Sequence, residues 1–209
     1  MLPRAGLVAQ AHTGPEGRKA VARRAGGDVR VWFDGEEAKD PDRRAAAALV
    51  SDAYALFLLG PMLLVTGGWG APRSVALEVG GAGDIVVGGR PFACDVLRGR
   101  MAPGLGLAAS DRVALFLDRE EGLMRRVRFS LDGMESTRGA VAEVDAYDHL
   151  ARHGVRWPTR FHERLLRPLQ MPVHDWWVTG LDVDRGFAAA DVEGGAFRGK
   201  AAAPAAALA

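Results

Sequence analysis

The segment His174-Asp175-Trp176-Trp177 is the densest polar and aromatic cluster in the chain. A carboxyl group beside apolar rings takes a raised pKa, so Asp175 with His174 could act as an acid-base pair. The alternative is structural, with the tryptophans closing one end of a sheet and Asp175 bonded to an arginine or a backbone amide. In a strand, His174 and Trp176 share one face, and Asp175 and Trp177 share the other. We favour the structural interpretation and assign no catalytic residue.

His149 and His153 are four residues apart, a spacing that on a helix can place two imidazoles on one metal ion. Asp145 and Asp148 are near enough in sequence to complete such a site. However, Gly154 follows at once, and the segment links two expected strands, which favours a solvated turn. We assign no metal ligand and no cofactor.

The glycine-rich segments 67–70 and 80–83 resemble phosphate-binding loops in composition only. No Lys-Ser/Thr pair accompanies either, so both are interpreted as turns. Cys94, the single cysteine, excludes an internal disulfide and a cysteine zinc site. By alternation it shares a face with Phe92 and Val96, which predicts a small core residue rather than a nucleophile.

Composition places the chain among soluble globular proteins of one domain. It has 209 residues, of which 48% are hydrophobic and 25% charged. The net charge of +1 offers no general field for nucleic acid. The longest apolar run, residues 53–65, is interrupted by Gly60-Pro61 and is shorter than the roughly 20 residues of a spanning helix. The N-terminus shows no secretory signal, so we expect either a cytoplasmic protein or one whose export signal has been removed.

Residues 111–133 are expected to form a half-buried β-hairpin, and the rest of the fold is inferred around it. Val113 and Leu115 alternate with other residues in the first arm, as Val127 and Phe129 do in the second, and this period of two is typical of strands. The link ends at Gly122, which can take a positive φ. A slip of one residue would turn the apolar side chains outward, so one face must cover a core or a ligand cavity.

The remaining elements are expected in the following order. Residues 1–27 form a mobile or partly helical lead-in, and residues 28–34 form a strand. A helix runs from Pro41 to Leu59, since Asp40-Pro41 is a start signal and Gly60-Pro61 a stop signal. Ser51 and Asp52 interrupt its apolar surface as a narrow polar strip, so the helix is expected to be buried on most sides.

From residue 73 onward, short strands separated by turn residues predict an antiparallel meander. Gly88-Gly89 is a two-residue hairpin turn, and Pro158 implies a bulge or an edge position. The single domain spans residues 28–187, and residues 188–209 are an Ala/Gly-rich, low-complexity tail. The predicted fold class is α+β, a curved antiparallel half-barrel of about eight strands that wraps one long apolar helix.

The hairpin and the strand after it resemble the LolA/LolB-like superfamily of bacterial outer-membrane lipoprotein carrier and sorting proteins. The resemblance covers residues 28–187. The residues that match the pattern are Asp118, Gly122, Arg126, Gly154, Val155 and Pro158. The resemblance implies a half-barrel with an apolar cavity for acyl chains, and a location in the cell envelope or periplasm. Because little sheet sequence precedes Asp28, a homodimer or a partner is expected to complete the sheet edge.

Our hypothesis is non-enzymatic binding of a lipid, an acyl chain or another apolar small molecule between sheet and helix. The expected cavity-lining residues are Leu56, Phe57, Leu115, Leu117, Val127, Phe129 and Trp177. The first alternative is an enzyme in the same cavity, with Asp175, His174 or Glu163 as acid or base. The second is a structural domain that binds a protein through an exposed patch of tryptophans, which would be Trp32, Trp157 and Trp176.

Overall fold

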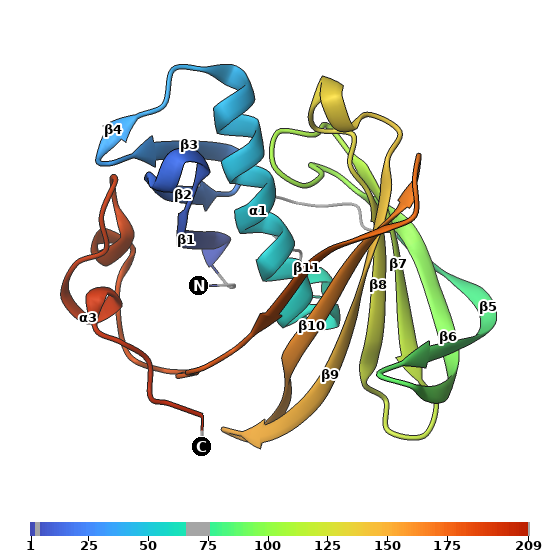
Figure 1. Cartoon of the computed structure of the whole chain (residues 1–209). Helices are drawn as coiled ribbons and strands as arrows, with labels where there is room; N and C mark the ends of the chain where they lie inside the picture. Colours follow the sequence, from blue (N-terminus) through green and yellow to red (C-terminus); the bar gives the residue numbers. More distant parts are fainter. Residues whose placement is uncertain (3–4, 66–75, 209) are drawn as a thin grey trace.

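The computed structural model describes residues 1–2, 5–65 and 76–208. In this part of the chain, two antiparallel sheets lie on either side of helix α1 (Pro41–Leu59), as Figure 1 shows. The predicted loop at residues 67–70 lies outside the described residues, and so does the start of the strand expected from Ser74. The coarse prediction of an α+β protein built mostly of antiparallel sheet is confirmed.

The first sheet, called the small sheet, is formed by the N-terminal residues. Its strands, in order, are β1 (Leu7–Thr13), β2 (Lys19–Ala25), β3 (Asp28–Phe33) and β4 (Glu36–Glu37). The expectation of a mobile or partly helical lead-in is wrong for β1 and β2. Alanines at alternate positions of β2, Ala20 and Ala22, are buried against α1, and small side chains carry little apolar periodicity to detect.

The second sheet, called the large sheet, has the order β11-β10-β9-β8-β7-β6-β5, so each strand pairs with its neighbours in sequence. Its strands are β5 (Ala76–Val87), β6 (Arg90–Met101), β7 (Asp111–Asp118), β8 (Met124–Ser130), β9 (Val141–Arg152), β10 (Val155–Arg167) and β11 (Met171–Trp177). The predicted meander is therefore confirmed. We call the face that packs on α1 the inner face, and the opposite one the outer face.

The β7–β8 hairpin buries the apolar face that its alternation predicts. Val113 lies opposite Phe129 and Leu115 lies opposite Val127, all on the inner face. Gly122 closes the link with φ +69°, and its amide donates to the carbonyl of Asp118 at 2.8 Å. A bulge at Arg125 adds one residue to β8, which turns this arginine toward the outer face.

Helix α1 begins and ends where the sequence predicts. The side chain of Asp40 accepts from the amide of Arg43 at 2.8 Å, and Gly60 follows the last turn with φ +44°. Ala47 and Ala48 pack on the small sheet, while Leu56 and Phe57 pack on the large sheet. Because both sides of the helix are covered, α1 is the central layer of three, as Figure 1 shows.

The prediction of about eight strands that wrap one long apolar helix in a half-barrel is wrong in its finer detail. The described strands form two sheets of four and seven, and the large sheet remains open at β5 and β11. The helix has 19 residues, and its first turn is polar. Asp52, predicted in a polar strip, is buried and paired with Arg24 of β2.

The β5–β6 hairpin bends over the outer face of the large sheet. Segment 80–83, predicted as a turn, lies within β5, where a register shift between Val79 and Ala82 marks a bulge. The Gly88-Gly89 turn has positive φ at both residues, as predicted. An added Cβ at Gly88 would lie 4.0 Å from the ring of Tyr147 on β9, so the hairpin tip reaches across to that strand. A second, smaller core forms beneath it around Cys94 and Phe116.

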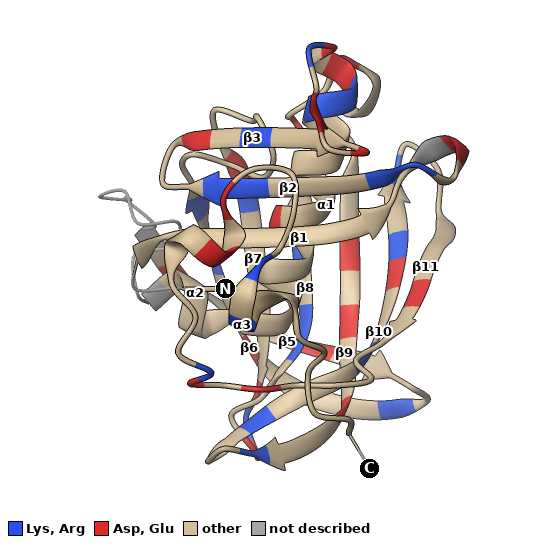
Figure 2. Cartoon of the chain, turned by 90° about the vertical axis from the view of Figure 1, so that its left-hand side faces the viewer, with Lys and Arg blue, Asp and Glu red and all other residues tan. Residues whose placement is uncertain are grey.

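Short helices and the C-terminal segment complete the fold. The remaining helices are η2 (Pro15–Gly17), α2 (Pro61–Val65), η3 (Glu135–Thr137), η4 (Ala189–Val192) and α3 (Gly199–Ala202). The predicted low-complexity tail packs on the rest of the molecule. Val192 is buried, a Cβ at Gly195 would approach Trp32, and the amide of Leu208 donates to the carbonyl of Thr179. Figure 2 shows this segment passing in front of the large sheet.

Candidate functional site

Charged side chains cross the outer face of the large sheet in rows set by strand register. Arg126 on β8 lies opposite Asp145 on β9, and Arg128 lies opposite Glu143. Arg164 on β10 lies opposite Glu143 from the other side. Figure 2 shows the acidic bands of β9 beside basic bands on neighbouring strands. Because side chains alternate along each strand, these five all leave the sheet on the same side.

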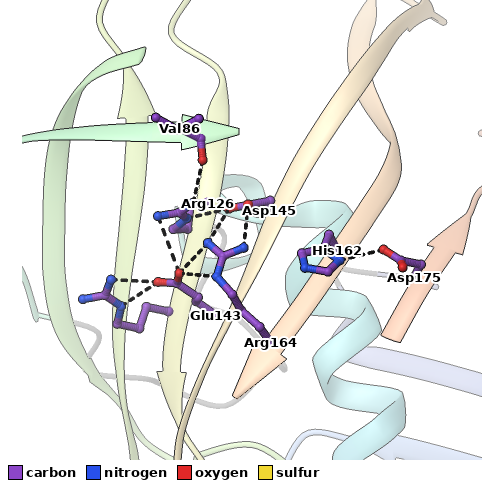
Figure 3. Close-up of polar contacts among 8 residues, drawn as sticks. Val86, Arg126, Glu143, Asp145, His162, Arg164 and Asp175 are labelled. Atoms are coloured by element: carbon purple, nitrogen blue, oxygen red, sulfur yellow. Dashed lines mark hydrogen bonds and ion pairs between the residues drawn. The ribbon is translucent and has the colours of Figure 1, made fainter. Parts of the chain in front are cut away.

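The five side chains form one ion-pair network, drawn in Figure 3. Glu143 accepts from Arg128 at 2.7 and 2.9 Å and from the Nε of Arg164 at 2.8 Å. Asp145 accepts from Arg126 at 2.5 Å and from Arg164 at 2.8 Å. Both carboxylates are buried, and burial of a charge is tolerated only with such partners. They are therefore structural anions rather than available acids or bases.

Arg126 also connects this network to the bent hairpin. Its Nη2 donates to the carbonyl oxygen of Val86 at 2.9 Å, the contact at the upper centre of Figure 3. The guanidinium of Arg125 lies over the ring of Phe92, 4.3 Å from the centroid, and bonds Asp118 at 2.8 Å. These contacts hold the end of β5 and β6 over the outer face.

A pocket of about 400 Å³ opens beside the network, on the same face. Its lining comes from β6 to β10 and comprises Arg98, Gly99, Arg112, Val113, Ala114, Arg128, Phe129, Ser130, Val141, Leu166 and Arg167. We call it the arginine pocket, because the charged side chains among its described lining residues are all arginines, four in number. Ala114, Val141 and Leu166 give it apolar walls, a combination typical of small-molecule sites.

Three of the pocket arginines have no acidic partner among the described residues. Arg128 is paired with Glu143, whereas Arg98, Arg112 and Arg167 form no ion pair in that part of the chain. They come from β6, β7 and β10, three separate strands. Guanidinium groups that converge on a pocket with apolar walls provide donors and positive charge for an anion.

The predicted acid-base residues are divided between the two faces of β11. On the outer face, Asp175 bonds His162 with 2.7 Å between Oδ1 and Nδ1, as Figure 3 shows. On the inner face, His174 bonds Glu163 at 2.7 Å. Asp175 and His174 therefore do not form a pair with each other, and none of the four residues lines the arginine pocket.

The residues weighed as a metal site do not gather around a common point. His149 lies within β9 rather than in a turn, and its Nδ1 is 3.3 Å from Arg125. His153 occupies the following turn with φ +54°. Among the described residues, no group of three or more His, Cys, Asp or Glu side chains could hold a metal ion. Burial, followed by the charges of Arg125 and Arg156, lowers the pKa of His149 to about 4.

Six of the seven predicted cavity-lining residues meet on the inner face. Leu56, Phe57, Leu115, Val127 and Phe129 are buried in one core cluster, and Leu117 packs against it. The rings of Phe57 and Phe129 are 5.4 Å apart. Trp177 is on the other side of β11 and is 57% exposed. Its neighbour Trp176 takes the inward position, stacked on Phe161 with centroids 5.4 Å apart, so the predicted face of Trp177 is wrong.

The predicted exposed patch of tryptophans is also wrong, because Trp32 and Trp157 are buried and Trp176 is partly buried. Cys94 is buried as predicted, and burial raises the pKa of its thiol, which makes it a poor nucleophile. Among the described helices, none has the length and apolar character needed to cross a bilayer.

Comparison of the chain with protein-family models, curated proteins and solved structures finds no match. The assignment of a function therefore rests on the site geometry.

Sequence reasoning did not single out the arginine pocket. A signal was present, because Arg98 and Arg100 occupy alternate positions of β6, as Arg126 and Arg128 do in β8. Arginines repeated with a period of two mark one face of a sheet. Locating the pocket required the pairing order of the strands as well, since Arg167 is distant in sequence from Arg98.

Proposed function

We propose that this protein is a non-enzymatic binding protein, whose ligand is a small organic anion with an apolar body held in the arginine pocket. The observation that carries the proposal is the convergence of Arg98, Arg112 and Arg167, each without an acidic partner in the described residues, on one pocket. Ala114 and Leu166 would contact the apolar part of the ligand, while the guanidinium groups would bind its acidic head.

A binding role is favoured over catalysis because the acidic side chains near the pocket are ion-paired and the histidines lie outside its lining. Glu143 and Asp145 are held by arginines, so neither is poised for proton transfer. The two histidine-carboxylate pairs lie outside the pocket lining. An enzyme that uses Asp175 or His174 remains the alternative, and it would need a substrate site at β11 rather than at the pocket.

The proposal keeps the binding role expected from the resemblance but changes the ligand, from an apolar molecule to an anion with an apolar part, and also its place. An apolar ligand between sheet and helix would have to separate side chains that contact one another, such as Phe57 and Phe129. The outer face provides an open pocket, so an amphiphile is accommodated there without disturbing the core. Membership of the LolA/LolB-like superfamily stays a prediction, and the resemblance favours binding over catalysis. A dimer or partner at the sheet edge also stays a prediction, but its premise is wrong, because β1 and β2 precede Asp28.

The test is isothermal titration calorimetry with hexyl phosphate, compared with hexanol as an uncharged probe. We expect hexyl phosphate to bind and Arg112→Gln to weaken it by about tenfold, since a charge-assisted hydrogen bond is worth roughly 1.5–3 kcal/mol. Arg18→Gln is the matched control, because it removes the same charge from the exposed Arg18–Asp34 pair of the small sheet region. Equal weakening by both substitutions, or hexanol binding as tightly as hexyl phosphate, would contradict the proposal.

A further inference from the structure

The arginine pocket carries more positive charge than a single carboxylate would neutralise. The network beside it contains Arg126, Arg128 and Arg164 against Glu143 and Asp145, so it has one positive charge in excess. The three arginines without ion pairs add to this excess. Like charges gathered in one place repel each other, and an anion of higher charge relieves this repulsion better than a monoanion.

The acidic side chains around the pocket do not remove this excess. Glu78 lies opposite Arg98 in the β5–β6 register, but it is exposed and forms no ion pair within the described residues. Asp132 accepts from the amide of Gly139, which lowers its pKa, and the charges of Arg112 and Arg100 act in the same direction at longer range. Glu143 is held by Arg128 and Arg164. The buried carboxylate of Asp111 accepts from the hydroxyl of Ser130 and from the amide of Leu105.

The arrangement of the arginines also favours a particular head-group shape. They come from β6, β7, β8 and β10, while β9 contributes the uncharged Val141. The donors therefore surround the pocket from several strands rather than forming one fork. A carboxylate presents two oxygens in a plane, which suits a single bidentate arginine, whereas a phosphate monoester presents three terminal oxygens in different directions.

We propose that the head group bound in the arginine pocket is a phosphate monoester in its dianionic form, contacted by Arg98, Arg112 and Arg167, with Arg128 shared between the ligand and Glu143. This inference rests on the proposed function and specifies the ligand. The same chemistry occurs in free alkyl or sugar phosphates and in the head group of phosphatidic acid, so the experiment needs one arm for each source.

The first experiment is a pH series of calorimetric titrations with hexyl phosphate, hexyl sulfate and hexanoate at pH 5 and pH 8. The second ionisation of a phosphate ester lies near pH 6, so only about a tenth of it is dianionic at pH 5. We therefore expect hexyl phosphate to bind roughly tenfold more tightly at pH 8. Hexyl sulfate keeps one charge throughout and should show no such rise. Hexanoate is partly protonated at pH 5, so its affinity should rise by less than about twofold. The described lining of the pocket contains no histidine, so protonation of a pocket imidazole cannot produce the same pH dependence.

Substitution of Arg167 connects the pH dependence to the pocket. Arg167→Gln should weaken hexyl phosphate at pH 8 by about tenfold and reduce the ratio between pH 8 and pH 5. Arg18→Gln should leave that ratio unchanged. The near-ultraviolet circular dichroism spectrum confirms that each variant is folded, and both positions are surface side chains.

The two sources are separated by sedimentation with vesicles of phosphatidylcholine containing phosphatidic acid. Binding that is lost with Arg167→Gln would identify the lipid head group, and absence of vesicle binding alongside hexyl phosphate binding would identify a free ester. If hexyl sulfate binds as tightly as hexyl phosphate at pH 8, with no pH dependence, the dianion inference is overturned while the anion-binding function stands. If none of the anions binds, both are overturned.

Discussion

Arg24 of β2 and Asp52 of α1 form a buried ion pair that joins the small sheet to the central helix. The Nη2 of Arg24 lies 2.6 Å from Oδ2 of Asp52, and its Nε lies 2.9 Å from both carboxylate oxygens. Gly106, in the loop between β6 and β7, accepts from Arg24 and donates its amide to Asp52 at 2.7 Å. One pair therefore connects both sheets through α1.

Removing one partner of this pair should destabilise the fold strongly. Asp52→Ala leaves the Arg24 guanidinium buried without its carboxylate, which we expect to lower the free energy of unfolding by about 3–5 kcal/mol. Urea denaturation followed by tryptophan fluorescence measures the change. The double substitution Arg24→Leu/Asp52→Leu should cost less than Asp52→Ala alone, because no buried charge remains.

The exposed pair Arg30–Glu37 provides the control for burial. Both side chains are about half exposed, so Glu37→Gln should change the free energy of unfolding by less than about 1 kcal/mol. If Asp52→Ala and Glu37→Gln lowered the free energy of unfolding equally, the buried Arg24–Asp52 pair would contribute no more to stability than an exposed pair.

Gly106 should resist replacement because its backbone approaches α1 closely. It has φ +59°, and an added Cβ would lie 3.0 Å from the amide nitrogen and 3.1 Å from the Cα of Leu49. We expect Gly106→Ala to lower the free energy of unfolding by about 2–4 kcal/mol, from backbone strain plus displacement of the loop. Thermal denaturation is a sufficient measurement.

Gly122 is the matched control, because it has φ +69° with open space around its Cβ position. Gly122→Ala should show the conformational cost alone, about 1 kcal/mol. If Gly106→Ala and Gly122→Ala lowered the free energy of unfolding equally, the close approach of Gly106 to α1 would add nothing to the cost of its replacement.

The parts of the fold that sequence could predict are those with strong local signals. The β7–β8 hairpin has a period of two and a glycine in its link, and α1 has a proline near its start and a glycine at its end. The helix has the predicted boundaries, whereas the second strand of the hairpin ends at Ser130 instead of continuing toward residue 133. The burial of Cys94 was predicted from the period-two alternation of β6.

The parts that sequence could not predict depend on partners distant along the chain. Ala20 and Ala22 are core residues only because α1 covers them. In the sequence, Asp52 is typical of a solvent-facing helix position. Its burial depends on the ion pair with Arg24, which is distant along the chain. For Trp176 and Trp177, alternation separates the two faces but does not say which one packs on Tyr54 and Phe57. The arginine pocket likewise requires the strand order.

His149 should make the fold less stable in mild acid. Burial, together with the charges of Arg125 and Arg156, lowers its pKa to about 4 from an ordinary value of 6.5. Between these values the unfolded chain binds a proton that the folded chain does not, so stability falls as the pH decreases through this window. We expect a loss of about 1–2 kcal/mol between pH 7 and pH 5, measured by urea denaturation at each pH.

His149→Gln should remove most of this loss. Burial also lowers the pKa of His12, which would leave a smaller dependence of the same sign. A stability difference between pH 7 and pH 5 that is unchanged in His149→Gln would assign the effect to another group.

Substitution of Glu143 should change stability and ligand binding in opposite directions. Glu143→Gln keeps the shape of the side chain but removes the buried charge that holds Arg128 and Arg164. We expect the free energy of unfolding to fall by about 2–4 kcal/mol, because Arg128 loses its carboxylate and Arg164 keeps only Asp145. Arg128 lines the pocket, so its release should tighten hexyl phosphate binding by roughly three- to tenfold.

Asp145→Asn is the matched control for this prediction, because Asp145 lies two residues along the same face of β9. It pairs with Arg126 and Arg164, neither of which lines the pocket. It should therefore destabilise the protein to a similar degree while leaving the affinity for hexyl phosphate nearly unchanged. If both substitutions tightened binding equally, the gain would come from net charge alone. A gain confined to Glu143→Gln would show that the ion-pair network restrains a ligand-binding arginine, which couples the structural role of β9 to the occupancy of the pocket.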